Sequence, residues 1–95
     1  MEKNEDLVEF QRIKILMKQN KLNGALEICE KEEFLENQLI QSPRIKILMK
    51  QNKLDEALKI CNKEIFLNED LIQSQKITIL IIQKKISEAL EICSK

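Results

Sequence analysis

The 95-residue chain contains no histidine, tryptophan or tyrosine, and it has only one glycine and one proline. Histidine is a common general base and zinc ligand near neutral pH, so its absence removes the usual apparatus of most enzyme classes. The single glycine, Gly24, cannot form a glycine-rich loop around a phosphate group. We therefore expect a protein that is not an enzyme and that uses no cofactor and no metal ion.

Long apolar runs and an excess of one charge are also absent. Lys plus Arg and Asp plus Glu each number 16, so the formal net charge is zero and supplies no general attraction to nucleic acid or to an anionic membrane. No stretch approaches the roughly 20 apolar residues of a membrane-spanning helix, and the start of the chain lacks the pattern of a secretory signal. These absences predict a cytoplasmic protein that contacts no membrane.

Cysteine is sparse, and its three copies are evenly spaced. Cys29, Cys61 and Cys93 recur at one constant spacing, each on an apolar stripe. If each cysteine lies on the same helix of a repeated helical hairpin, neighbouring cysteines are roughly 9 to 10 Å apart, which is too far for a disulfide. A zinc site needs four convergent ligands, and three separated cysteines do not supply them. We expect all three cysteines to be reduced and buried in the core.

The chain does contain an internal repeat. Residues 12–43 and 44–75 are identical at 23 of 32 positions, and a third copy begins at Lys76. A period between about 20 and 50 residues indicates a stack of supersecondary units. Each copy carries two helical patterns, and in the second pattern Leu54, Ala57 and Cys61 form one apolar stripe with charged residues opposite.

Two asparagines and the proline suggest where helices end and begin. Asn20 and Asn52 stand where the first helix of a copy should stop, and Asn tolerates the left-handed conformation that closes many helices. Proline is comfortable only in a first helical turn. The first helix of the second copy is therefore expected to start at Gln41 or Ser42, or to bend at Pro43.

The segments "KLDEALKIC" and "KISEALEIC" resemble the second helix of tetratricopeptide (TPR) repeats, with pentatricopeptide repeats as a distant relative. Ala25, Ala57 and Ala89 match the small residue that lets the second helix of a repeat pack closely on the first. The resemblance implies an all-α fold, a right-handed α-solenoid of about three stacked helix-turn-helix repeats, each about 32 residues long. We expect a single domain over residues 1–95, with repeats at about 5–36, 37–68 and 69–95, the last one truncated.

A ladder of basic residues follows the first helix of the first two copies, which lines the concave face in this architecture. The candidate partner-binding residues are Arg12, Lys14, Lys18, Arg44, Lys46 and Lys50. Such a ladder fits an acidic protein or peptide, although nearby carboxylates could instead pair with these charges. The expected function is that of a non-catalytic protein–protein interaction or scaffold module that binds a peptide or partner helix on its concave face.

Two other functions stay open. The chain could be a purely structural repeat array, or a fragment of a longer solenoid, with no ligand of its own. It could also bind RNA in the pentatricopeptide manner, with base-reading positions at Gln11, Pro43 and Gln75. Proline has no side-chain donor and the net charge is zero, so nucleic acid is the less favoured partner.

The third copy differs from the other two on its first helix. Thr78 and Ile82 replace the lysines of the earlier copies, and Ile81 extends the apolar run. Apolar surface at the end of a stack of repeats needs a cover. We therefore expect a homodimer through the C-terminal repeat, most simply about a two-fold axis, with an interface at Thr78, Ile81 and Ile82. The alternative is that Ile82 folds back onto Ile86 or Leu90 within its own hairpin.

Overall fold

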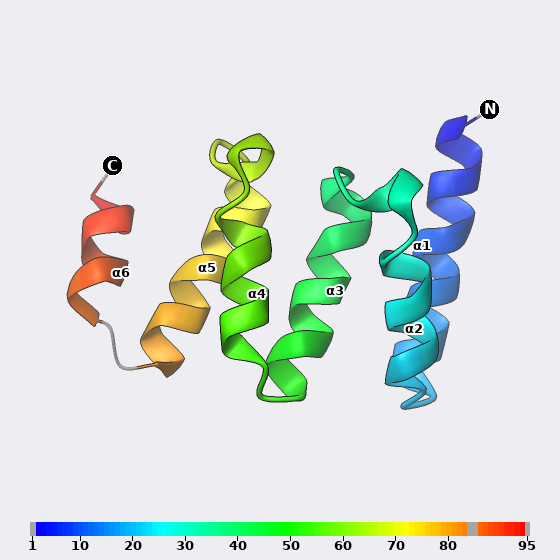
Figure 1. The fold of residues 1–95 in the computed structure, drawn as a ribbon, viewed down its shortest axis with the longest axis horizontal. Helices are drawn as coiled ribbons and strands as arrows, with labels where there is room; N and C mark the ends of the chain where they lie inside the picture. The colour runs from blue at the N-terminus through cyan, green and yellow to red at the C-terminus, as the bar shows by residue number, and fades with distance from the viewer. Residues whose placement is uncertain (1, 84–85, 95) are drawn as a thin grey trace.

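A computed structural model describes residues 2–83 and 86–94, and these residues are helical with short connections and no strand (Figure 1). The α-helices are α1 (Glu2–Lys18), α2 (Leu22–Cys29), α3 (Gln38–Lys50), α4 (Leu54–Cys61), α5 (Asp70–Ile82) and α6 (Ile86–Cys93). Two short 3-10 helices, η1 (Glu32–Phe34) and η2 (Glu64–Phe66), connect α2 to α3 and α4 to α5. The all-α class expected from the sequence is confirmed.

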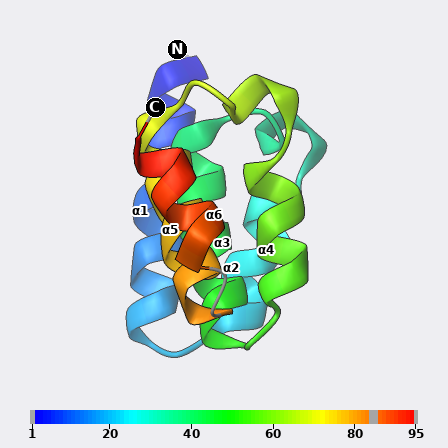
Figure 2. The ribbon, with the colours of Figure 1, turned by 90° about the vertical axis from the view of Figure 1, so that its left-hand side faces the viewer.

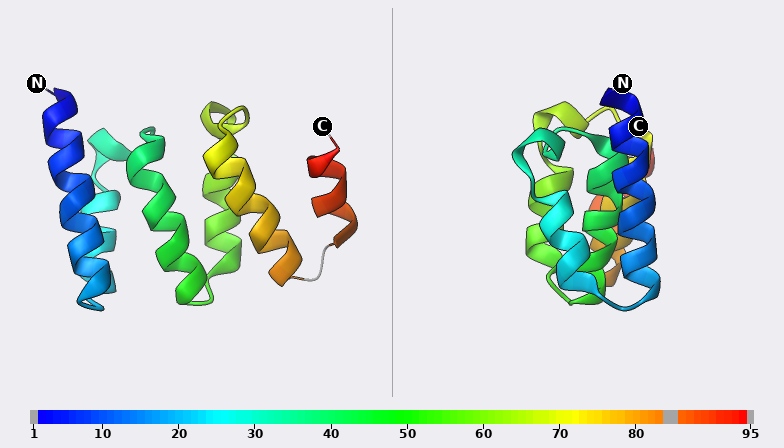
Figure 3. Two further views of the ribbon diagram at one scale, coloured as in Figure 1. Left: turned by 180° about the vertical axis from the view of Figure 1, so that it is seen from behind. Right: turned by 90° about the vertical axis from the view of Figure 1, so that its right-hand side faces the viewer.

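Consecutive helices pair into antiparallel hairpins, α1 with α2, α3 with α4, and α5 with α6. The first helices pack on one another, α1 on α3 and α3 on α5, while α2 packs on α3 and α4 on α5. Seen from behind, α1, α3 and α5 lie in front of α2 and α4 (Figure 3), and an end-on view separates these two layers (Figure 2). The whole measures 40 × 27 × 18 Å. None of the helices in the described residues has the length and apolar character needed to cross a membrane.

The core forms where the apolar stripes of neighbouring helices meet. Six isoleucines of the first helices are fully buried, namely Ile13, Ile40, Ile45, Ile47, Ile72 and Ile79. Ala25 and Ala57 are fully buried on the second helices, and the side chain of Ala89 lies outside the described residues. Phe34 and Phe66 are buried at the ends of η1 and η2, so each connection between hairpins contributes an aromatic ring to the core.

The turns inside the first two hairpins follow the expectation for asparagine. Asn20 and Asn52 both have a φ of 60°, which is the left-handed conformation. After Asn20, the backbone N–H of Lys21 donates to the carbonyl of Leu16 at 2.8 Å, and this bond satisfies a carbonyl that the end of a helix leaves without a partner. The predicted ends of α1 and α3 are therefore confirmed.

Replacing Asn52 with alanine should lower the free energy of unfolding by about 1 kcal/mol, because a Cβ-bearing residue without a polar side chain strains at positive φ. Asn52→Gly should be neutral or stabilising, because glycine adopts this conformation without strain. Urea unfolding of both variants measures the difference. An alanine variant as stable as the glycine variant would contradict the proposed role of the left-handed turn.

The first helix of the second hairpin begins earlier than Pro43 suggested. It starts at Gln38, so the later start expected from the proline is wrong, and Pro43 lies inside α3. Asn37 explains the early start, because its side chain accepts a hydrogen bond of 2.9 Å from the backbone N–H of Leu39. An N-cap of this kind stabilises a helix by about 1 kcal/mol and offsets part of the cost of a proline further along.

A glutamine near the start of α3 and of α5 ties each hairpin to the one before it. The Gln41 amide donates to the carbonyls of Cys29 and Phe34, both at 2.8 Å. Gln73, the equivalent residue of the next copy, donates to the equivalent carbonyls of Cys61 and Phe66 at 3.1 and 3.0 Å. The same side chain therefore satisfies the end of the preceding α-helix and the end of the 3-10 helix in both connections.

The cysteines do not behave alike. Cys29 and Cys61 are fully buried and free, as expected, but Cys93 is free and exposed, so the expectation of three buried thiols is wrong for Cys93. The reason lies in the neighbouring helices. The helix α3 covers α2 and α5 covers α4, whereas among the described residues no later helix packs on α6.

Candidate functional site

A groove lies on the face formed by the first helices. It has a volume of about 470 Å³. Its lining residues come from α1, α3 and the start of α5, and they are Phe10, Lys14, Met17, Lys18, Leu39, Ser42, Pro43, Lys46, Lys50 and Leu71. We call this surface the lysine groove. Its lining combines four cations with mostly apolar residues.

The period of the helix and the period of the repeat together place the four lysines. Lys14 and Lys18 are four residues apart on α1, so they lie on one face of that helix, and Lys46 and Lys50 repeat the spacing on α3. Packing of α1 on α3 brings the two pairs to the same groove. All four side chains are exposed. The ammonium group of Lys14 also lies 5.3 Å from the centre of the Phe10 ring, a cation–π distance.

The charge of the groove is unbalanced locally although the chain is neutral overall. No carboxylate is among its lining residues in the described part of the chain. The ion pairs found among residues 2–83 and 86–94 involve Arg12, Lys31 and Arg44, and none involves a lysine of the groove. The four ammonium groups therefore lie over an apolar lining without a carboxylate partner among the described residues.

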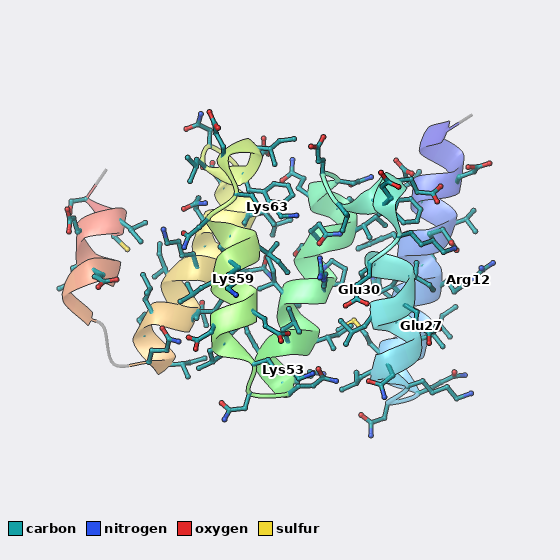
Figure 4. The ribbon with its side chains drawn as sticks, viewed as in Figure 1. Arg12, Glu27, Glu30, Lys53, Lys59 and Lys63 are labelled. Carbon is teal, nitrogen blue, oxygen red and sulfur yellow. The ribbon has the colours of Figure 1, made fainter. Side chains whose placement is uncertain are left out.

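The two arginines of the predicted ladder lie elsewhere. Arg12 pairs with Glu9 at 3.0 Å. It lies on α1, the helix at one end of the row, and points away from the other helices (Figure 4). Arg44 is largely buried between hairpins, where it donates to the Gln41 side chain at 2.9 Å and lies 3.7 Å from a carboxylate oxygen of Glu30. The structure thus brings the lysines together and separates both arginines from them.

The residues expected to form an oligomer interface lie at the end of α5. Ile81 and Ile82 are about half exposed, at 54% and 51%. Thr78 is exposed and its hydroxyl donates to the carbonyl of Ser74 at 3.2 Å. On α6, Leu90 is exposed as well. The C-terminal hairpin therefore presents several apolar side chains to solvent.

The apolar lining of the groove was not anticipated from the sequence. Phe10 lies one turn before Lys14 on α1, while Leu39 and Leu71 open the repeated segment "LIQS" near the starts of α3 and α5. That repeated segment was the available signal, because it places the same leucine beside the groove twice. Among the described residues, no group of three or more cysteine, aspartate or glutamate side chains is arranged to hold a metal ion.

No family model matches the chain, and no curated protein or solved structure matches it either.

Proposed function

We propose that the protein is a TPR-like, right-handed α-solenoid of about three helical hairpins that acts as a non-catalytic binding module. Its ligand is an acidic peptide or an acidic amphipathic helix of a partner protein, held in the lysine groove. Such a partner would place apolar side chains on Leu39, Pro43 and Leu71, and carboxylates beside the lysines. A cytoplasmic site of action belongs to the same proposal, because free thiols persist in a reducing compartment.

One observation carries the proposal: four exposed lysines converge on an apolar groove whose lining contains no carboxylate in the described residues. Exposed lysines on a helical surface are normally interspersed with acidic residues, and that pattern serves solubility. Here the groove repels cations and attracts anions, while its apolar lining can hold aliphatic side chains. Charge and hydrophobicity together fit the acidic and apolar faces of one amphipathic helix.

RNA binding receives less support from the geometry. Gln75, one of the three positions expected to read bases, is buried, and its amide donates to the carbonyl of Ser42 at 3.0 Å. A side chain engaged in this way between α5 and α3 is not free to read a base edge. A protein ligand therefore remains the proposal.

Self-association through the C-terminal hairpin is a second part of the proposal. Thr78, Ile81 and Ile82 lie on the exposed end of α5, where the first two hairpins carry lysine or methionine at all of the equivalent positions. A homodimer about a two-fold axis would bury the two isoleucines of each copy. Burying an isoleucine side chain stabilises a contact by about 1.5 to 3 kcal/mol before the costs of association.

The test uses a fluorescent peptide of about 18 residues with leucine at helical spacing and glutamate at the other positions. The wild-type chain should bind it, and fluorescence anisotropy should show weaker binding as salt is added. Lys46→Glu combined with Lys50→Glu should weaken binding by at least about tenfold. The melting temperature should stay within a few degrees, because both side chains are exposed.

The matched control lies on the opposite layer of helices. Lys53 and Lys59 lie on the α4 side of the molecule (Figure 4), are exposed, and are not among the residues that line the lysine groove. Lys53→Glu combined with Lys59→Glu changes the net charge by the same amount and should leave peptide binding unchanged. Equal losses in both double variants would mean that the peptide responds to total charge, and the proposal would be wrong.

A further inference from the structure

The outer face of α1 carries residues whose equivalents are buried in both later hairpins. We call this surface, made of Val8, Gln11 and Ile15, the head face. Val8 and Ile15 are 56% and 55% exposed. The residues equivalent to Val8 in the second and third hairpins are Ile40 and Ile72. Those equivalent to Ile15 are Ile47 and Ile79, and all four of these isoleucines are fully buried. In α3 and α5 this face is covered by the preceding hairpin.

At the other end of the molecule, the outer face of α6 also carries exposed residues whose equivalents in earlier hairpins are more buried. We call Leu90 and Cys93 the tail face. Leu90 is 64% exposed, whereas its equivalent Leu26 is 8% exposed and its equivalent Leu58 is partly buried against the core. Cys93 is exposed where Cys29 and Cys61 are fully buried. The earlier residues are covered because α3 packs on α2 and α5 packs on α4.

The residues equivalent to the head face and those equivalent to the tail face lie at two contacts between hairpins of this chain. These contacts join the first hairpin to the second and the second to the third. Gln75 on α5 donates to the carbonyl of Ser42 on α3, and the head face has glutamine at the equivalent position, Gln11. The carbonyl equivalent to that of Ser42 in the last hairpin belongs to Ser74. Gln11 and Ser74 therefore preserve this hydrogen-bonding pair at the two ends.

A cation accompanies each covered cysteine. Burial raises the pKa of the Cys29 and Cys61 thiols, and the positive charges of Arg44, for Cys29, and of Lys76, for Cys61, oppose that effect. Arg44 donates to the Gln41 side chain, whose amide donates to the carbonyl of Cys29. Arg12 is the third member of this series, one repeat before Arg44. The end of α1 thus offers a cation where a preceding tail face would bring Cys93.

We propose that the head face of one copy of this chain binds the tail face of a second copy. The contact repeats between chains the packing that the chain already makes twice within itself. Because head and tail are different surfaces, the contact is heterologous, and a pair of copies still has one head face and one tail face free. This surface pair lies apart from the lysine groove and does not depend on the proposed ligand. It is an alternative to the two-fold homodimer through Thr78, Ile81 and Ile82, and the experiment below distinguishes the two modes of self-association.

One position at the head face weakens this contact. Gln41 and Gln73 donate to carbonyls of the preceding hairpin, but the equivalent residue of α1 is Glu9, which is paired with Arg12 and Lys31. A carboxylate cannot donate to the carbonyl of Cys93 in a neighbouring copy. Glu9→Gln supplies the missing donor and should lower the dissociation constant of self-association about fivefold.

The decisive experiment blocks one end at a time. Ile15→Lys blocks the head face and Leu90→Lys blocks the tail face, and both residues are exposed in the single chain, so both variants should keep the wild-type circular dichroism. In a phosphine reductant, light scattering with size exclusion should give each variant alone the 11.2 kDa monomer mass. An equimolar mixture should give twice that mass, because one free tail then meets one free head.

The wild-type chain in the same experiment should show a mass that keeps rising with concentration beyond that of a dimer. A wild-type chain that stays at the 11.2 kDa monomer mass up to about 1 mM overturns the proposal. It is also overturned if Ile15→Lys alone still dimerises, since that result assigns the contact to a two-fold axis through the C-terminal hairpin. Val8→Lys repeats the head block at an independent position.

Discussion

Replacing Gln41 with leucine should lower the free energy of unfolding by about 2 to 4 kcal/mol, because the change removes two buried hydrogen bonds and leaves the carbonyl of Cys29 without a donor. The carbonyl of Phe34 keeps the backbone N–H of Asn37 as a donor, at 3.1 Å. Gln41 is fully buried and its amide donates to Cys29 and Phe34 at 2.8 Å. Leucine has a similar volume but can satisfy neither carbonyl. Urea unfolding followed by circular dichroism measures the change, and a loss of this size is a large share of the stability of a small domain.

Two glutamines of the same chain serve as comparisons. Gln73→Leu should cost less than Gln41→Leu, because Gln73 is only partly buried and water can reach part of its site. Gln38→Leu, at the first position of α3, should cost little, because Gln38 makes no side-chain hydrogen bond among the described residues. If Gln41→Leu unfolds at the urea midpoint of Gln38→Leu, the amide does not hold the hairpins together.

Thiol labelling of the native protein should separate Cys93 from the other two cysteines by a factor of about 100 or more. Cys93 is exposed, whereas Cys29 and Cys61 are fully buried. Burial raises the pKa of both buried thiols to about 11 from 9.0, and it outweighs the opposing charges of Arg44 and Lys76. At pH 8 this shift alone reduces the reactive thiolate about 100-fold.

Labelling with a chromogenic disulfide and identifying the modified peptides by mass spectrometry gives the three rates. The control is the same reaction in 8 M urea (about the concentration that unfolds most small proteins), where all three cysteines should react alike. Native rates that are equal for the three thiols would show that α3 and α5 do not cover the cysteines as described.

The same pKa shift makes stability depend on pH in the alkaline range. A thiol whose pKa is higher in the folded state than in the unfolded state adds to the free energy of unfolding. This contribution is complete at pH values below the unfolded pKa, and it is lost as the pH rises towards about 11. Urea midpoints should therefore fall between pH 8 and pH 10 more steeply for the wild type than for the variant with Cys29→Ala and Cys61→Ala. Parallel pH profiles would assign the alkaline loss to other groups.

Features set by local chain geometry could be predicted from the sequence. Asn20 and Asn52 end their helices in the left-handed conformation because few residues other than glycine tolerate it as well. Likewise, spacing alone placed Lys14 with Lys18 on one side of α1, because residues four apart share a helix face. Such features depend on neighbours in the chain, and the repeated sequence displays each of them twice.

Features set by contacts between distant segments could not be predicted. Gln41 finds its carbonyl partners only after η1 has brought the end of α2 close to α3. Arg44 occupies the same ladder as Lys46 in the sequence, yet it turns towards Gln41 and Glu30 because it lies on the side of α3 that meets the first hairpin. Sequence periodicity identifies a helix face but not which neighbour will cover it.

The extensive packing among the described helices, which lies within hairpins and between adjacent hairpins, favours fast folding. The extensive helix contacts of the described residues never skip a hairpin. Residues that meet are therefore close in sequence, little loop entropy opposes their meeting, and folding should be fast for the size of the chain. Order can start in any hairpin and spread to its neighbour, so the middle hairpin, which alone touches both others, should exchange its amide hydrogens most slowly.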